Sequence, residues 1–312
     1  MINRVAATLH LPYFTTLRLS SLLLVILFKL ILPPLTYLCV FWAVLFGHYA
    51  LAFYYSRRNA LYLLQNPRTW IPALGLLALS FACFSTGFDP ILIAYFGIHH
   101  ALTETYLTMP VSIIPSQNKS RNEMVLSRFL VTLLIYVVLQ RHYFSFSESV
   151  LPFILLATFG FFIFSGITHY HKRDSVPRSW LIDIGLFELI GFVLLCIVFN
   201  EQIAFEDMIF YHLLVWIFYP FSTAKLRNNT KQQRQYILLT VFVTLAFFIV
   251  TPITQIAPVL TVEVWGSLAF LWGYIHISTS FMLSGMNPLW ISRWFMHPKR
   301  TSEPLQAVPK ML

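Results

Sequence analysis

Long apolar runs alternate with short polar stretches along the whole chain. A helix rises about 1.5 Å per residue, so a bilayer crossing needs about 20 mostly apolar residues. We expect an all-α, polytopic transmembrane helical bundle of about nine spans, within a range of eight to ten, forming a single integral membrane domain over residues 1–312. The predicted spans are Leu35–Tyr55, Thr69–Phe88, Pro90–Ile113, Met124–Gln140, Val150–Thr168, Ser179–Phe199, Ile203–Phe221, Tyr236–Thr251 and Val259–Gly285.

The stretch 13–32 before the first span is ambiguous. Pro33 and Pro34 separate it from that span, since proline interrupts a helix. Arg18 and Lys29 count against a clean crossing. A tenth crossing, a re-entrant segment and an interfacial helix all remain open. No small-residue cleavage site precedes a polar mature start, so we expect the segment to be retained rather than removed as a signal peptide.

The basic residues set the predicted orientation. One side of the predicted bundle carries 16 of the 21 Lys and Arg residues, whereas the loops of the other side carry only Arg141. Because cytoplasmic loops are enriched in Lys and Arg, the rich side is predicted to be cytoplasmic, together with the C-terminal tail 293–312. The 16 residues are Arg57, Arg58, Arg68, Lys119, Arg121, Lys172, Arg173, Arg178, Lys225, Arg227, Lys231, Arg234, Arg293, Lys299, Arg300 and Lys310.

The composition agrees with a lipid environment. Hydrophobic residues make up 58% of the chain and charged residues only 11%, about half the charge of a soluble domain. The net charge of +9 comes from basic residues in the short loops between apolar runs. Membrane topology explains these residues, so we expect no nucleic-acid partner. Cys39, Cys83 and Cys196 all lie inside apolar runs and offer neither a disulfide framework nor a thiolate metal site. We predict a multi-pass protein of the cell (inner) membrane.

Ionisable residues within the predicted spans are candidates for function, because a charge inside a bilayer is costly. The histidines all lie on odd-numbered spans, which run from the outside to the cytoplasm, at depths of roughly 10–20 Å from the cytoplasmic end. Four helices therefore place imidazole at a similar level. The residues are His48, His99, His100, His212 and His276, with Glu104 beside them and Asp183 and Glu188 on the sixth span.

Imidazoles from several helices are typical of a transition-metal site in a bundle core, with iron, zinc or copper as the ion. Glu104 follows His100 by four residues on the same helix face, where it could orient the ring or bind the metal directly. His99 and His100 point about 100° apart on a helix, so we expect only one of them to reach a shared ion. The alternative is that each ring is simply hydrogen-bonded within the bundle.

Several catalytic motifs are missing from the sequence. It contains no Gly-rich phosphate loop and no Gly-x-Ser-x-Gly nucleophile elbow. It also contains no His-x-x-x-His pair of the kind that membrane desaturases use for a diiron cluster. The histidines therefore favour a mononuclear metal site.

The order of the histidine segments resembles the Brp/Blh family of membrane carotenoid-cleaving dioxygenases. Its Pro-His-Gly-Ala-x-Asp motif is loosely similar to Gly47–Leu51, and its Ile-His-Phe-Gly-x-x-Asp motif is similar to Ile98–Glu104. Its Ile-His-x-x-x-His motif resembles Tyr211–Trp216, and its Pro-His-x-x-x-x-Asp motif resembles the segment that begins at Ile275.

This resemblance implies a mononuclear Fe(2+) held by His48, His99 or His100, His212 and His276, beside a carotenoid-like or other unsaturated lipid substrate. The chain departs from the family at Trp216, which replaces the second histidine of the third motif, and it lacks the acidic residues of the first and fourth motifs. A transporter with a histidine proton relay, and a non-catalytic membrane protein that has lost the site, are the alternative functions.

Overall fold

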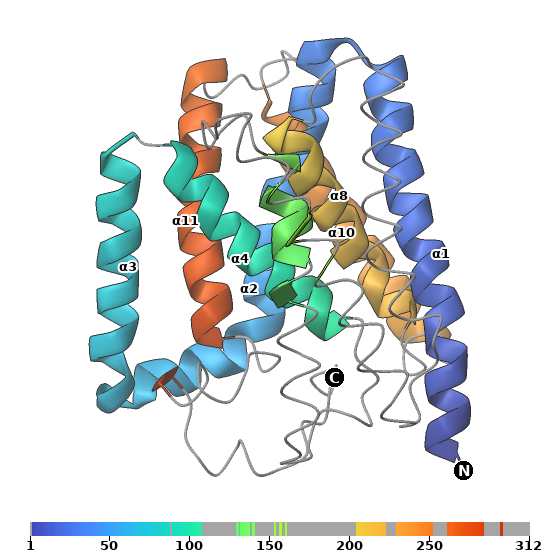
Figure 1. Cartoon of the computed structure of the whole chain (residues 1–312), viewed down its shortest axis with the longest axis horizontal. Coiled ribbons are helices and arrows are strands. Elements are labelled where there is room, and N and C mark those ends of the chain that lie inside the picture. The colour runs from blue at the N-terminus through green and yellow to red at the C-terminus, as the bar shows by residue number, and fades with distance from the viewer. Residues whose placement is uncertain are drawn as a thin grey trace. The chain divides into compact units, whose positions relative to one another are not determined.

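The structure is a computed structural model, and it is all-helical wherever it is described (Figure 1). Every element within the described residues is a helix, and these residues contain no strand, which confirms the predicted all-α class. The described residues are 2–87, 89–107, 129–130, 132–137, 139–140, 153, 156–157, 160, 204–222, 229–251, 261–283 and 294–295.

Six of the predicted spans coincide with a helix to within a few residues at most ends. After α1 (Ile2–Ile31), the matching helices are α2 (Pro34–Gln65), α3 (Trp70–Ser85), α4 (Asp89–Leu107), α8 (Phe205–Ser222), α10 (Thr230–Ile249) and α11 (Val262–Leu283). A short 3-10 helix, η1 (Pro67–Thr69), precedes α3. The sixth span, most of the fifth and much of the fourth lie outside the described residues, as does the predicted tail apart from 294–295.

The ambiguous stretch 13–32 belongs to a longer helix than the sequence predicted. α1 runs without a break for 30 residues, so the chain does not reverse direction inside it. It ends at the predicted proline pair, and Pro34 occupies the first turn of α2, where its missing N–H leaves no hydrogen bond unmade.

The described chain divides into two compact units. The first contains residues 1–26 and 96–209, and the second contains residues 27–95 and 210–312. Helices α1, α4 and α8 contribute residues to both units.

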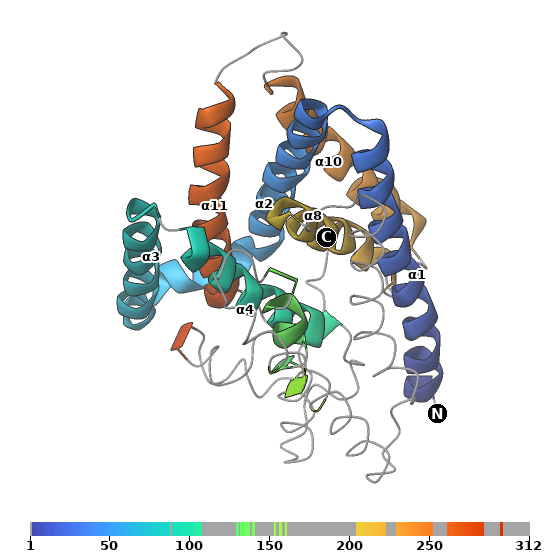
Figure 2. The same cartoon turned by 45° about the horizontal axis from the view of Figure 1, so that its top comes forward.

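In the second unit, α2 packs against α10 and α11, and α11 lies between α2 and α3 (Figures 1 and 2). Aromatic rings fill the contact between α2 and α11, where Trp42 stacks on Trp265 at 6.4 Å and Phe46 meets Trp265 edge-on at 5.1 Å. Gly47 lets α10 approach α2, since a Cβ added there would lie 2.8 Å from Thr244 Oγ1.

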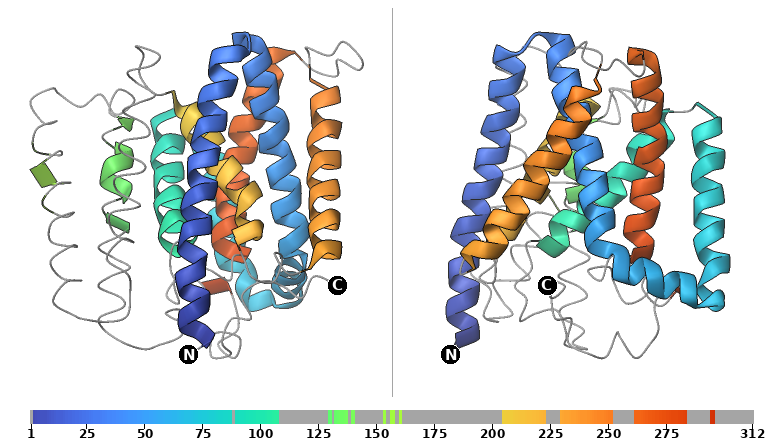
Figure 3. Two further views of the ribbon diagram at one scale, coloured as in Figure 1. Left: turned by 90° about the vertical axis from the view of Figure 1, so that its right-hand side faces the viewer. Right: turned by 180° about the vertical axis from the view of Figure 1, so that it is seen from behind.

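α2 changes direction in its last turns, which lead sideways to the base of α3 (Figure 3). Ser56 Oγ donates to the carbonyl of Ala52 at 2.6 Å, and such back-bonding to the preceding turn bends helices. Arg57 Nη1 donates to the Tyr54 carbonyl at 2.8 Å. The predicted span ended at Tyr55, but the helix continues to Gln65 because its backbone bonds do not require apolar side chains.

The described part of the first unit is built around the end of α4. Gly97 leaves room for the ring of Tyr136, which is only 1% exposed, and a side chain at Gly97 would overlap that ring. Phe96 meets Phe205 edge-on at 5.4 Å. At the start of α8, the Ala204 N–H donates to Asp207 Oδ2 at 3.2 Å, which satisfies a backbone donor at that end.

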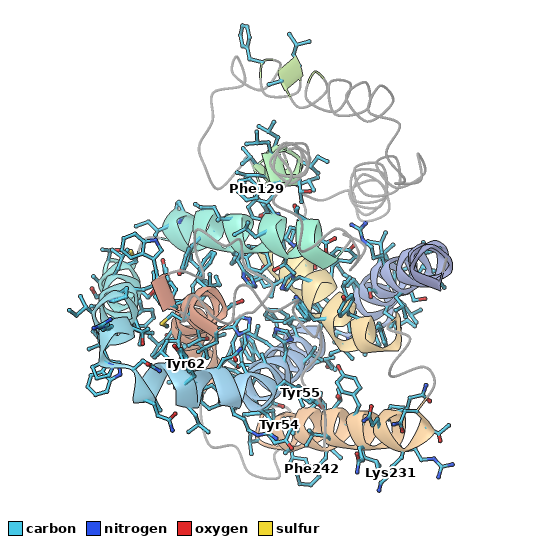
Figure 4. All side chains as sticks on the ribbon, turned by 90° about the horizontal axis from the view of Figure 1, so that it is seen from below. Tyr54, Tyr55, Tyr62, Phe129, Lys231 and Phe242 are labelled. Carbon is cyan, nitrogen blue, oxygen red and sulfur yellow. The ribbon has the colours of Figure 1, made fainter. Side chains whose placement is uncertain are left out.

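Two helical segments, Pro34–Arg57 and Pro67–Ser85, are long and apolar enough to cross a membrane. Within an 18-residue stretch of each, 61% of the residues are buried in the first segment and 17% in the second. A core helix of a soluble protein or a signal sequence would meet the same criteria, so the nine-span count is not confirmed. The outer faces of two helices are nevertheless strongly apolar. Ile71 on α3 is 81% exposed, and Phe242 on α10 is 71% exposed and points away from the packed helices (Figure 4).

The close approach at Gly47 gives a stability prediction. Gly47→Ala should lower the free energy of unfolding by about 1–3 kcal/mol, the usual cost of overpacking a close helix contact. Thermal unfolding in detergent measures the change. Gly75→Ala on α3 is the matched control, because a Cβ there meets nothing within 4 Å. Equal stability of the two variants would contradict the close contact.

Candidate functional site

Three of the predicted histidines lie together in the second unit. His48 on α2, His212 on α8 and His276 on α11 come from three separate helices. The ring centre of His48 lies 4.9 Å from that of His276 and 6.3 Å from that of His212. His48 is 8% exposed and His212 2%, so these two rings are buried.

Two aromatic side chains frame these rings. Tyr49 stacks on His276, with ring centres 4.5 Å apart and planes at 26°. Trp216 lies one helical turn after His212, and its ring centre is 6.2 Å from His48 and 6.4 Å from His212. The residue that departs from the family motif therefore belongs to the cluster. We call His48, Tyr49, His212, Trp216 and His276 the histidine cluster.

Contacts outside the cluster hold its helices in place. Tyr236 Oη donates to the Ile217 carbonyl at 2.9 Å and so ties α10 to α8 next to Trp216. Asn59 Nδ2 donates to the Leu283 carbonyl at 2.7 Å, which satisfies an acceptor at the end of α11 from α2. Gly47, immediately before His48, sets the distance between α2 and α10.

The histidine cluster has suitable donors for a transition metal but is not closed around one point. Metal–nitrogen bonds of about 2.0–2.1 Å at tetrahedral angles place imidazole centres about 5 Å apart. His48 and His276 have this spacing, whereas His212 is more than 1 Å too far from His48. Correspondingly, no three His, Cys, Asp or Glu side chains within the described part of the chain are arranged to hold an ion. Rotation of the His212 ring would be needed to complete the site.

The remaining predicted residues lie in the first unit. His99 is 5% exposed and His100 is fully buried, so burial does not select one of them. The ring of His100 stacks on Phe96 at 5.8 Å with planes at 16°, and its centre is 6.2 Å from that of Tyr136. Glu104, one turn further along α4, is also fully buried.

Glu104 forms an ion pair that was not predicted from the sequence. Arg18 Nη2 on α1 lies 3.0 Å from Glu104 Oε2, and the two side chains are 2% and 0% exposed. In the sequence, the charge of Arg18 was an argument against a membrane crossing by residues 13–32. In the structure, Glu104 compensates this charge inside the protein. The available signal was that an acidic and a basic residue both fall in apolar runs, where unlike charges tend to pair.

Some predicted features lie outside the described residues. These are Asp183 and Glu188, together with the Arg and Lys residues of the loops around 119–121 and 172–178.

The chain matches no protein-family model, no curated protein and no solved structure. The likeness to the carotenoid-cleaving dioxygenases therefore rests on the histidine segments alone.

The buried ion pair gives the second prediction. Arg18→Met or Glu104→Leu alone should cost about 3–5 kcal/mol of folding stability, because each leaves an uncompensated buried charge. The double variant should recover most of the loss, since it removes both charges. Thermal unfolding of the detergent-solubilised protein measures all three, with Lys231→Met at an exposed position as the control. Additive losses in the double variant would show that the pair is not coupled.

Proposed function

We propose that the chain is a polytopic integral membrane protein whose histidine cluster binds iron and supports oxidation of an apolar, carotenoid-like or other unsaturated lipid. The observation that carries this proposal is the gathering of His48, His212 and His276 from three helices, with ring centres 4.9 and 6.3 Å from that of His48.

Support for a membrane setting comes from the surface as well as the composition. Soluble proteins rarely expose broad apolar patches. The outer face of α10 nevertheless exposes Leu238, Val241, Phe242 and Leu245, each at more than half of its surface. α3 exposes Ile71, Leu74, Leu79 and Phe81 in the same way. Lipid chains would cover both faces without cost.

α2, which carries His48, is one of the two candidate spans, whereas α4, α8 and α11, which carry the other histidines, are less apolar than α3 and are not. Each contains imidazole together with Tyr or Trp, and these side chains lower the mean hydropathy. A helix that faces the interior of a bundle tolerates such residues, because neighbouring helices rather than lipid surround them.

The protein's own residues would have three tasks in the proposed reaction. His48, His212 and His276 would hold the ion through neutral ring nitrogens. Tyr49 would fix the plane of His276 by stacking, and Trp216 would close one side of the site with an apolar surface and limit access of water. A bound iron ion would supply the activation of dioxygen, which side chains cannot perform.

Topology can be tested by cysteine labelling. In a variant without native cysteines, Thr86→Cys should react with an impermeant maleimide on intact cells, whereas Arg68→Cys should react only after permeabilisation. These exposed positions flank α3, so opposite labelling means that α3 crosses the membrane. Identical labelling of both positions, or recovery of the protein in the soluble fraction, would contradict the proposed spans.

Metal binding can be tested by elemental analysis of the purified protein. We expect about one iron per chain after expression in iron-replete medium, and loss of most of it in His48→Ala or His212→Ala, because each change removes a donor. Tyr49→Phe is the control, since it keeps the ring stack and all three imidazoles.

The position that departs from the family motif provides a second comparison. Trp216→His adds an imidazole one turn from His212 and should raise iron affinity, because imidazole is a suitable donor for iron. Pure wild-type protein with no iron, zinc, copper or manganese would end the metal proposal. In that case, a pH-dependent substrate flux would favour a proton-relay transporter.

A further inference from the structure

A second site lies in the same unit, away from the histidine rings. A partly open cavity of about 250 Å³ is enclosed by the end of α3, the start of α4 and the first half of α11. Most of the residues that line it are apolar or are glycines. The lining residues are Cys83, Phe84, Gly87, Leu92, Gly266, Ser267, Phe270 and Tyr274.

Hydroxyl groups next to this cavity join the helices that form it. Ser80 and Ser278 share a hydrogen bond, and the Tyr95 hydroxyl lies 3.0 Å from Ser278 Oγ. The three residues come from α3, α11 and α4, the same helices that form the walls. Ser278 Oγ also donates to the Tyr274 carbonyl at 2.7 Å. Buried networks of this kind fix the spacing of helices, so the cavity is preformed.

Glycine provides the space inside the cavity. A Cβ built on Gly266 meets nothing within 4 Å, so a side chain at this wall position would extend into open volume. Binding pockets for drug-sized ligands begin at about 300 Å³, and this cavity is smaller. It therefore suits the end of a flexible chain rather than a whole molecule.

The surroundings indicate the class of ligand. None of the described residues in the walls of the cavity is charged, and the polar ones among them are Ser267, Cys83 and Tyr274. α3 beside it exposes Leu79 and Phe81 by 60% and 62%, surfaces that lipid chains would cover. We propose that this cavity binds the hydrocarbon chain of a lipid, inserted between α3 and α11.

This binding does not require a metal ion, so it can hold or fail independently of the proposed oxidation. α11 nevertheless connects the two sites. A Cβ at Gly273 would lie 3.6 Å from Leu92 of the cavity and 3.8 Å from Tyr49 Oη of the histidine cluster.

Native mass spectrometry of the detergent-purified protein tests the proposal, with farnesol and lauric acid as isoprenoid and straight-chain probes. We expect one bound probe per chain for at least one of the two, and the comparison identifies the preferred chain. Gly266→Leu should reduce binding about tenfold or more, because leucine fills the cavity. Gly75→Leu is the matched control on α3 and should bind like the wild type, since Gly75 also faces open space but lies outside the cavity.

Alkylation of Cys83 locates the probe without any substitution. The bound chain should slow N-ethylmaleimide modification of the peptide containing Cys83 several-fold, whereas Cys39, which is fully buried elsewhere, serves as the internal reference. Absence of probe binding, equal binding to Gly266→Leu, or an unchanged Cys83 rate with probe bound would each overturn the proposal.

Discussion

The structure depends on one constraint: a polar side chain inside an apolar bundle must find a partner within the protein, on its own helix or on a neighbouring one. Water is excluded there, and an unsatisfied group costs several kcal/mol. Arg18 and Glu104 meet this constraint by pairing between α1 and α4. The hydroxyl groups of Ser80, Tyr95 and Ser278 meet it among α3, α4 and α11. Each of these contacts thereby determines which helices lie next to each other. Apolar packing alone would allow several arrangements of the same helices.

Close helix contacts supply the precision that such polar contacts require. Gly47 immediately precedes His48, and its missing side chain lets α10 lie against α2. Gly97 precedes His99 by two residues and accommodates Tyr136 in the same way. In both cases the glycine sets the position of a helix segment that carries histidine. Helix pairs that pack through small residues tolerate little displacement, so the rings borne by these segments are well positioned.

The helices could be predicted well from the sequence, because a long apolar run seldom forms any other structure. Their ends were less accurate, as at Gln65, where backbone bonding continues the helix past the apolar run. The common depth of His48, His212 and His276 follows from counting residues along each helix. What the count cannot supply is the rotation of each helix about its axis, and this decides which rings meet. The pairing of Arg18 with Glu104 was missed for the same reason, since residues far apart in sequence reveal their contact only when the helices pack.

Trp216 bears most directly on what the histidine cluster can do. It lies one turn after His212, where a second imidazole would complete a four-nitrogen set, and its ring contacts both His48 and His212. An indole cannot donate a lone pair to a metal, so the cluster offers three imidazoles at most. Three protein ligands leave coordination positions open, as a catalytic centre requires and a structural metal site does not. Trp216 is therefore compatible with a metal centre that has open positions, provided that His212 can turn toward the other two rings.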